Sequence, residues 1–355
     1  MRASKEAETD KTPSPRLARY RYFMLSYAIG VDLGGTNLRI AAIDESGKLL
    51  EKLSSDTDLA RGRDFVIDEM TQAIRRLLDR FRGHGESRGV GIGVPGIIDM
   101  DTGMLRESPN LPGWSEFPVH AEIERRLGIP VMLENDANAA ALGEKWLGAA
   151  KDYGSMCMLT LGTGVGGGIV LDGKIWHGMN GMAGELGHIN VEPEGHPCKC
   201  GSRGCAEQYA SATAVVRMAR EAVANNLSKE LARAAEGEEF SSLHVYQLAM
   251  QGDAAAQQIF RRMGRALGMV LADMVNALNL PIYVIGGGAA SAWDAFAPTM
   301  MEEVRKRSFV YAATVPEAPP AAKPSKSTLI TMAKLGGEAG LYGAACLPLQ
   351  RAGVK

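Results

Sequence analysis

The sequence contains two copies of one short pattern, in which an apolar strand runs into a glycine-rich turn and then into a hairpin. In the first copy the predicted strand covers residues 27–32 and the turn covers residues 33–37. In the second copy the strand covers 156–161, the turn covers 162–168, and the hairpin reverses at Asp172-Gly173, a favoured tight-turn dipeptide. The repeat indicates an internal duplication in which each copy founds one α/β domain. We therefore expect the functional site in a cleft between two domains.

Length and charge agree with a two-domain protein and exclude several function classes. The chain has 355 residues, and a single hydrophobic core rarely grows beyond about 250–300 residues. The formal net charge of -2 gives no general attraction to nucleic acids or membranes. No apolar run approaches the roughly 20 residues that span a bilayer, and the charged N-terminus lacks the apolar core of a secretory signal. We expect a cytoplasmic protein with a disordered extension over residues 1–25, where charged residues and prolines follow no periodicity.

The first turn has the composition of a phosphate-binding loop. Gly34 and Gly35 let backbone N–H groups approach phosphate oxygens closely, and Thr36 and Asn37 add side-chain donors. Asp32, at the end of the strand, could hold Mg²⁺ through water. The alternative is an ordinary tight hairpin, and the second copy of the pattern favours the functional interpretation.

The second turn superficially matches two nucleotide-binding fingerprints, and the residues around it exclude both. Gly162, Gly164 and Gly167 have the spacing of a dinucleotide fingerprint, but that motif needs a helix after the glycines and a hairpin follows here. A P-loop would need Ser or Thr where Ile175 stands. We therefore predict a second phosphate-binding turn, with Thr163 as a hydroxyl donor.

Asp136 follows a predicted strand, residues 130–133, in the segment where a helix begins. A carboxylate at the carboxyl end of a strand, facing an interdomain cleft, is where a general base belongs. The same position suits an N-cap residue. The residues alone do not separate a catalytic base from a simple helix cap.

Three cysteines and a histidine gather in one short stretch. Cys198, Cys200 and Cys205 form a C-x-C-x4-C pattern, and His188 lies upstream. Three thiolates and one imidazole are a common ligand set of structural zinc, and free buried thiols are the alternative. The spacing favours a Zn²⁺ site.

These motifs, in this order, resemble the ROK family (repressors, open reading frames and kinases), in particular its bacterial zinc-containing glucokinases. The resemblance covers residues 27–345 and rests on the motifs Asp32-Leu-Gly-Gly-Thr36, Gly93-Val-Pro-Gly96, Asn135-Asp136, Gly162-Thr-Gly164, Glu185-x-x-His188, and Cys198-x-Cys200 with Cys205 and Glu207. It implies an α/β protein with the two-domain ASKHA fold (the actin, sugar kinase and Hsp70 architecture), with duplicated RNase H-like cores and an interdomain active-site cleft. It also implies an ATP-dependent glucokinase, an ATP:hexose 6-phosphotransferase that converts glucose to glucose 6-phosphate.

The resemblance also assigns roles to individual residues. Asp136 would be the general base, and His188 would both bind zinc and reach the sugar. The implied substrate-binding residues are Gly96, Asn110, Asn135, Asp136, Glu185, His188 and Glu207. The implied ATP-binding residues are Asp32, Gly34, Gly35, Thr36, Asn37, Thr163, Gly164, Gly286, Gly287 and Gly288, of which the last three would form a wall against adenosine. Zn²⁺ would be structural, held by His188, Cys198, Cys200 and Cys205, and Mg²⁺ would accompany ATP.

The expected domain division places a small α/β domain at residues 26–136, joined by a C-terminal helix at 337–355. A large α/β domain covers residues 137–336 and contains the zinc-binding segment 188–205. The expected partners are glucose or a related hexose and ATP, with no nucleic acid and no membrane. The family further suggests a homodimer or a homotetramer.

Alternatives remain inside and outside the enzymes of this family. Kinases for N-acetylmannosamine, N-acetylglucosamine, mannose or fructose share these motifs, and polyphosphate stays open as a donor in place of ATP. A sugar-responsive ROK repressor is less favoured, because a lead of about 26 residues without helical periodicity is too short for a helix-turn-helix domain. A zinc-knuckle nucleic-acid binder is disfavoured by the lack of a basic patch around residues 198–205.

Overall fold

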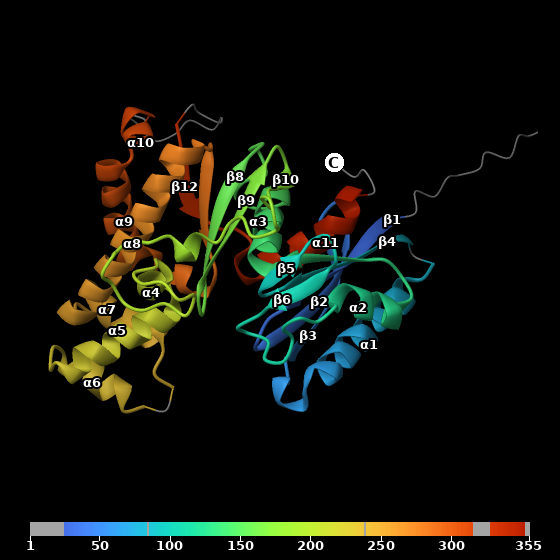
Figure 1. The fold of residues 1–355 in the computed structure, drawn as a ribbon, viewed down its shortest axis with the longest axis horizontal. Helices are drawn as coiled ribbons and strands as arrows, with labels where there is room; N and C mark the ends of the chain where they lie inside the picture. The colour runs from blue at the N-terminus through green and yellow to red at the C-terminus, as the bar shows by residue number, and fades with distance from the viewer. Residues whose placement is uncertain (1–24, 84, 238, 315–326, 352–355) are drawn as a thin grey trace, which may run out of the picture.

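The computed structural model describes residues 25–83, 85–237, 239–314 and 327–351, which form two lobes side by side (Figure 1). The expectation of a disordered extension over residues 1–25 falls outside these ranges except for Leu25, which is the first residue of a strand. Within the described ranges, no helix combines the length and the apolar character that a bilayer-spanning segment requires.

The first lobe is built on a five-stranded sheet with the order β3-β2-β1-β4-β7. Its first three strands form an antiparallel meander, and β4 and β7 then add parallel to β1. The strands are β1 (Leu25–Leu33), β2 (Asn37–Asp44), β3 (Leu49–Asp56), β4 (Gly85–Val94) and β7 (Val131–Asn135). A two-stranded sheet of β5 (Ile97–Asp99) and β6 (Met104–Glu107) is inserted between β4 and β7.

The second lobe repeats this topology with the order β10-β9-β8-β11-β12. Again an antiparallel meander comes first, and two strands then add in parallel. The strands are β8 (Met156–Leu161), β9 (Val165–Leu171), β10 (Lys174–Ile175), β11 (Ile282–Gly286) and β12 (Leu329–Met332). The identical strand order confirms the internal duplication predicted from the two glycine-rich turns.

Helices cover the sheets through apolar stripes at helical spacing. In α1 (Arg63–Phe81) the stripe of Val66, Met70, Ile74 and Leu77 is buried against the first sheet together with α2 (Val119–Leu127). The second sheet packs on a helical layer centred on α8 (Ala254–Leu278), which has the bounds that its periodicity predicts. The other helices of this lobe are α4 (Glu207–Ala210), α5 (Ala212–Ala224), α6 (Lys229–Ala235), α7 (Ser242–Met250), α9 (Trp293–Arg307) and α10 (Phe309–Thr314). Short 3-10 turns are η1 (Leu59–Arg61), η2 (Leu186–His188), η3 (Gly288–Ala292) and η4 (Gly336–Glu338).

Two helices, α3 (Asp136–Trp146) and α11 (Ala339–Arg351), lie between the lobes (Figure 1). α3 packs on the second sheet and α11 on the first, although each follows a strand of the opposite sheet. The two helices cross at very close range, because an added Cβ at Gly343 would overlap the carbonyl oxygen of Ala139. Ala339 and Gly143 make the reciprocal contact. The pair therefore links the two duplicated units through backbone contacts.

We predict that Gly343→Ala lowers the free energy of unfolding by about 1–3 kcal/mol, the usual range for overpacking. The sign is informative, because Gly→Ala inside a helix ordinarily stabilises by about 1 kcal/mol. Chemical denaturation of the variant beside Gly154→Ala, whose added Cβ would meet nothing within 4 Å, measures the effect. A Gly343→Ala protein as stable as the wild type would contradict the close crossing.

Candidate active site

Asp136 is the first residue of α3, and the cap of this helix is its neighbour Asn135. The Oδ1 atom of Asn135 accepts hydrogen bonds from the backbone N–H groups of Ala137 at 2.9 Å and Asn138 at 3.2 Å. The carboxylate of Asp136 accepts a hydrogen bond from the N–H of Ala137 at 2.9 Å. The sequence left open whether Asp136 is a catalytic base or a simple helix cap. Because Asn135 is the cap, Asp136 does not have that role.

Three predicted site carboxylates gather at this end of α3. Burial raises the pKa of Asp136, and the charge of Glu185 raises it further, while the N–H of Ala137 opposes the shift. Burial and the charge of Asp136 raise the pKa of Asp32 to about 6, against the effect of Arg39, whose Nη1 lies 3.4 Å from Asp32 Oδ2. The fold thus brings Asp32 of the first glycine-rich repeat and the Glu185 segment to the start of α3.

Asn135 also connects to the predicted substrate residue Gly96. The Nδ2 atom of Asn135 donates a hydrogen bond to the Gly96 carbonyl oxygen at 3.0 Å. Gly96 has a φ of 120°, and an added Cβ would overlap Glu107 and lie 2.9 Å from Ser108 Cα. Only glycine fits this backbone, so the Gly96 carbonyl is held in place beneath the cap.

The two predicted phosphate-binding turns are closed in a similar way. In the first, the N–H of Gly34 donates to Asn37 O at 2.8 Å, and Thr36 and Asn37 are exposed. In the second, the N–H of Gly162 donates to Gly164 O at 2.9 Å, and Thr163 is exposed. In each turn, one N–H group therefore forms the hydrogen bond that closes the turn, and hydroxyl or amide side chains are exposed to solvent.

Two predicted substrate-binding residues, Asn110 and Glu207, lie against the glycine-rich turns. Asn110 lies against the first turn, since an added Cβ at Gly35 would come within 2.8 Å of its carbonyl oxygen. Glu207, expected near the sugar, lies against the second turn, where its Oε2 accepts the N–H of Val165 at 3.0 Å.

The glycines expected to face adenosine stand at the carboxyl end of β11. Gly286 pairs with Thr160 of the neighbouring strand β8, which leads into the second turn. Gly287 has a φ of 85°, and an added Cβ would overlap Leu161, while an added Cβ at Gly288 would meet nothing within 4 Å. These three residues therefore neighbour the second turn, whereas Asp32 and Asn110 lie beside the first.

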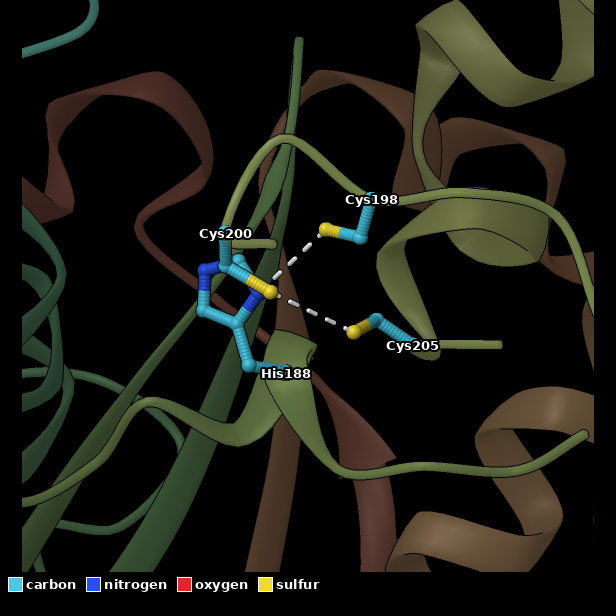
Figure 2. Close-up of side chains that lie close together, drawn as sticks. All are labelled: His188, Cys198, Cys200 and Cys205. Atoms are coloured by element: carbon cyan, nitrogen blue, oxygen red, sulfur yellow. Dashed lines mark hydrogen bonds between the residues drawn. The ribbon is translucent and has the colours of Figure 1, made fainter. Parts of the chain in front are cut away.

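His188 and the three cysteines converge on one point (Figure 2). Their ligand atoms all lie within 4.8 Å of one another, with 3.7 Å between Cys198 Sγ and His188 Nδ1 and 3.7 Å between Cys200 Sγ and Cys205 Sγ. Tetrahedral zinc with Zn–S bonds of about 2.3 Å separates two sulfurs by about 3.8 Å. The donor set and its spacing therefore fit a tetrahedral zinc ion.

The imidazole of His188 has its two nitrogens in different surroundings. Nδ1 faces the sulfur of Cys198, and Nε2 lies 3.8 Å from the Oε2 atom of Glu185. Glu185 in turn acts on the pKa of Asp136. One ring thus connects the cysteine cluster to the group of carboxylates at α3.

Sequence reasoning missed a buried ion pair beside this group. The side chain of Glu134 is only 2% exposed, and its Oε2 lies 2.7 Å from Nε2 of His177. Its Oε1 accepts from the N–H of Asn135 and from Nδ2 of Asn138, both at 3.0 Å. The sequence does show a glutamate directly before Asn135-Asp136, at the end of an apolar strand. It does not indicate that this glutamate pairs with His177.

The ROK family profile matches residues 28–351 of the chain. The chain belongs to the ROK family. It is 38% identical over 329 residues to a glucokinase of Halalkalibacterium halodurans, covering 91% of this chain and 95% of that protein. It is 41% identical over 277 residues to a glucokinase of Thermotoga maritima, covering 78% of this chain and 86% of that one.

Solved structures of the ROK family share the fold. A ROK glucokinase from Streptomyces griseus, in complex with glucose and AMPPNP, is 34% identical with a TM-score of 0.72, over 91% of this chain and 99% of that chain. The predicted ROK membership and the ASKHA-type α/β fold are therefore confirmed.

We predict opposite stability effects at two adjacent residues. Asn135→Ala should lower the free energy of unfolding by about 1–2 kcal/mol, because α3 loses its cap. Asp136→Asn should raise it at pH 7, because a carboxyl whose pKa is raised in the folded state disfavours folding when it ionises. The gain should disappear below about pH 3.8, where the carboxyl is protonated in both states.

Urea titrations of both variants at pH 7 and pH 3 measure these differences. An Asp136→Asn protein that is less stable than the wild type at pH 7 would mean that Asp136, and not Asn135 alone, supports the helix end.

Proposed function

We propose that this protein is an ATP-dependent glucokinase, which transfers the γ-phosphoryl group of ATP to the 6-hydroxyl of glucose. The observation that carries the proposal is the carboxylate of Asp136, which is not the helix cap, has a raised pKa and neighbours both Asp32 and Glu185. The similarity to glucokinases over nearly the whole chain supports glucose as the substrate.

Asp136 is proposed as the general base. As the sugar oxygen attacks the γ-phosphorus, the hydroxyl proton passes to the carboxylate, and the bond from phosphorus to the bridging oxygen of ADP breaks. A raised pKa suits this role, because it makes the carboxylate a stronger proton acceptor than an ordinary aspartate. Phosphoryl transfer otherwise needs positioning and charge stabilisation more than covalent chemistry from the protein.

The sugar is proposed to lie at the start of α3. Candidate hydroxyl ligands are the side chains of Asn110, Asn135, Glu185, His188 and Glu207 and the backbone of Gly96. The Glu207 carboxylate already accepts the N–H of Val165, so its contact to a sugar would use its other oxygen. Carboxylates and amides are suitable partners for sugar hydroxyls because they offer fixed acceptors and donors.

The phosphates of ATP are proposed to lie between the two glycine-rich turns. Thr36, Asn37 and Thr163 are exposed and offer donors, and Gly286, Gly287 and Gly288 would flank the nucleoside. Asp32 would hold Mg²⁺ through water, and the ion would neutralise charge on the β- and γ-phosphates. A pKa of about 6 leaves Asp32 mostly ionised at neutral pH.

A structural zinc ion is proposed at His188, Cys198, Cys200 and Cys205. Four protein ligands leave no open position, so the ion would supply no Lewis-acid chemistry to the reaction. It would fix the segment 188–205 and the orientation of the His188 ring, whose Nε2 then points to Glu185.

The domain division is also proposed. The small domain would comprise residues 26–136 with the C-terminal segment from 337, which is supported by the packing of α11 on the first sheet. The large domain would comprise residues 137–336. Assembly into a homodimer or a homotetramer is a further expectation from the family.

We predict that the purified protein phosphorylates glucose with Mg-ATP at a higher kcat/KM than mannose, fructose, N-acetylglucosamine or N-acetylmannosamine. A coupled ADP-release assay over this panel tests it, with polyphosphate as an alternative donor. Asp136→Asn should lower kcat by about 100- to 10,000-fold and keep glucose affinity, because the amide retains hydrogen-bonding capacity. Preference for another sugar would correct the substrate, and near-normal turnover of the variant would exclude Asp136 as the base.

We predict that Cys205→Ala yields a folded protein without zinc that binds glucose much more weakly. ATP binding should change less, since the turns at Asp32 and Gly162 lie outside the zinc segment. Metal analysis and separate titrations with glucose and a non-hydrolysable ATP analogue measure this. Cys346→Ala is the matched control, because it removes a buried thiol outside the cluster. Unchanged glucose affinity in zinc-free Cys205→Ala would separate the metal from the sugar site.

A further inference from the structure

The buried carboxylate of Glu134 has no role in the mechanism proposed above. It stands at the end of β7 with a side chain that is 2% exposed, and its partner His177 is 32% exposed. A buried charge is retained only where its partners compensate for the lost hydration. Three donors do so here, the N–H of Asn135, Nδ2 of Asn138 and Nε2 of His177. Of these, only the imidazole can carry a compensating charge.

Each oxygen of Glu134 holds a different part of the site. Oε1 binds Asn135 and Asn138, which flank Asp136 at the start of α3. Oε2 binds His177, which follows β10 in the second lobe. The carboxylate therefore joins the segment that carries the proposed base to a loop of the other lobe.

The loop that begins at His177 leads directly to the proposed sugar ligands. The N–H of Ala183 donates to the His177 carbonyl oxygen at 3.1 Å, which closes the loop just before Glu185. At its tip, Gly181 lies against Ile98 of β5, where an added Cβ would come within 2.8 Å of the carbonyl oxygen. The hydrogen bond between His177 and Glu134 thus fixes the start of the segment that leads to Glu185 and His188.

A second histidine–glutamate pair, in which both side chains are partly exposed, serves for comparison. His120 is 35% exposed and its Nε2 lies 3.4 Å from Oε1 of Glu124, which is one turn away on α2 and 37% exposed. His120 Nε2 also lies 2.9 Å from the carbonyl oxygen of Val131, and Glu124 Oε1 accepts the N–H of Val131 at 3.0 Å, so this pair borders the first residue of β7, at the opposite end from Glu134. The Glu134–His177 pair is shorter, has a buried carboxylate and spans 43 residues.

We propose that Glu134 and His177 form a positioning pair for the sugar site, which holds the Asn135–Asp136 turn and the segment of Glu185 in a fixed relation across the two lobes. The proposal rests on the proposed function only in taking a hexose as the ligand. Neither residue is a reacting group. Their effect would be on sugar affinity and on the productive placement of the sugar hydroxyl against Asp136.

The test compares His177→Leu, His177→Gln and the matched control His120→Leu in the full chain. His177→Leu should lower kcat/KM for glucose at least about tenfold, mainly through KM for glucose, because it leaves Oε2 of a buried carboxylate without its hydrogen-bond donor. KM for ATP and zinc content should stay within about twofold of the wild type. His177→Gln, which keeps a donor for Oε2, should recover most of the loss, and His120→Leu should leave both KM values unchanged.

Hydrogen–deuterium exchange gives a second readout that needs no substrate. His177→Leu should speed exchange in residues 177–188 and at the start of α3, whereas His120→Leu should not. Wild-type protein that is inactive on every hexose would contradict the proposed function, and the exchange data would still decide on the pair. Normal glucose kinetics in His177→Leu, or exchange unchanged in both segments, would overturn the positioning role.

Discussion

The crossing of α3 and α11 is the contact on which the site depends. Gly343 and Gly143 let the two helices meet backbone to backbone, and each helix packs on the sheet of one lobe. The far end of α3 is fixed as well, because the buried carboxylate of Glu144 accepts the N–H groups of Ala149, Lys334 and Leu335 at 2.7, 3.1 and 2.7 Å. A helix held along its length offers a rigid support for its first residue. The packing of α3, more than the hydrogen bonds of Asp136 itself, therefore fixes the position of Asp136.

The charges around Asp136 work against the stability of the fold. Burial raises the pKa values of Asp32 and Asp136. The charge of Asp136 raises that of Asp32 further, and the charge of Glu185 raises that of Asp136, so each carboxyl disfavours the folded state when it ionises. Arg39 offsets part of this effect beside Asp32, where its Nη1 lies 3.4 Å from the carboxylate. Nearby, the hydrogen bond to Glu134 raises the pKa of the His177 imidazole. This distribution is typical of a site whose electrostatics serve binding and proton transfer at the expense of stability.

Features that depend on a local residue pattern could be predicted from the sequence. Contacts between residues far apart in the chain could not. The duplicated turns, the bounds of α8 and the convergence of His188 with Cys198, Cys200 and Cys205 follow from spacing within one segment, and the structure contains all of them. The contact of Glu207 with Val165 joins residues 42 positions apart, and that of Glu134 with His177 joins residues 43 apart. Such pairs are set by how distant segments pack in the folded chain, and no periodicity encodes them. Even the choice of Asn135 over Asp136 as the cap depends on where the strand ends.

The two strand–turn–hairpin repeats share a backbone arrangement, but they differ in charge at the second residue pair from the turn. The last paired residues before the turns are Leu33 with Leu38 in the first hairpin and Leu161 with Val165 in the second. One step further from the turn, the first copy has Asp32 opposite Arg39, and the second has Thr160 opposite Gly166. The charged pair agrees with the proposed role of the first turn in binding a cation and phosphates. The glycine instead leaves room for α3, since an added Cβ at Gly166 would come within 2.9 Å of Ala137 Cβ, directly beside Asp136. One copy thus supplies the charge and the other supplies the space for the helix that carries the proposed base, so the two repeats contribute different parts to one proposed site.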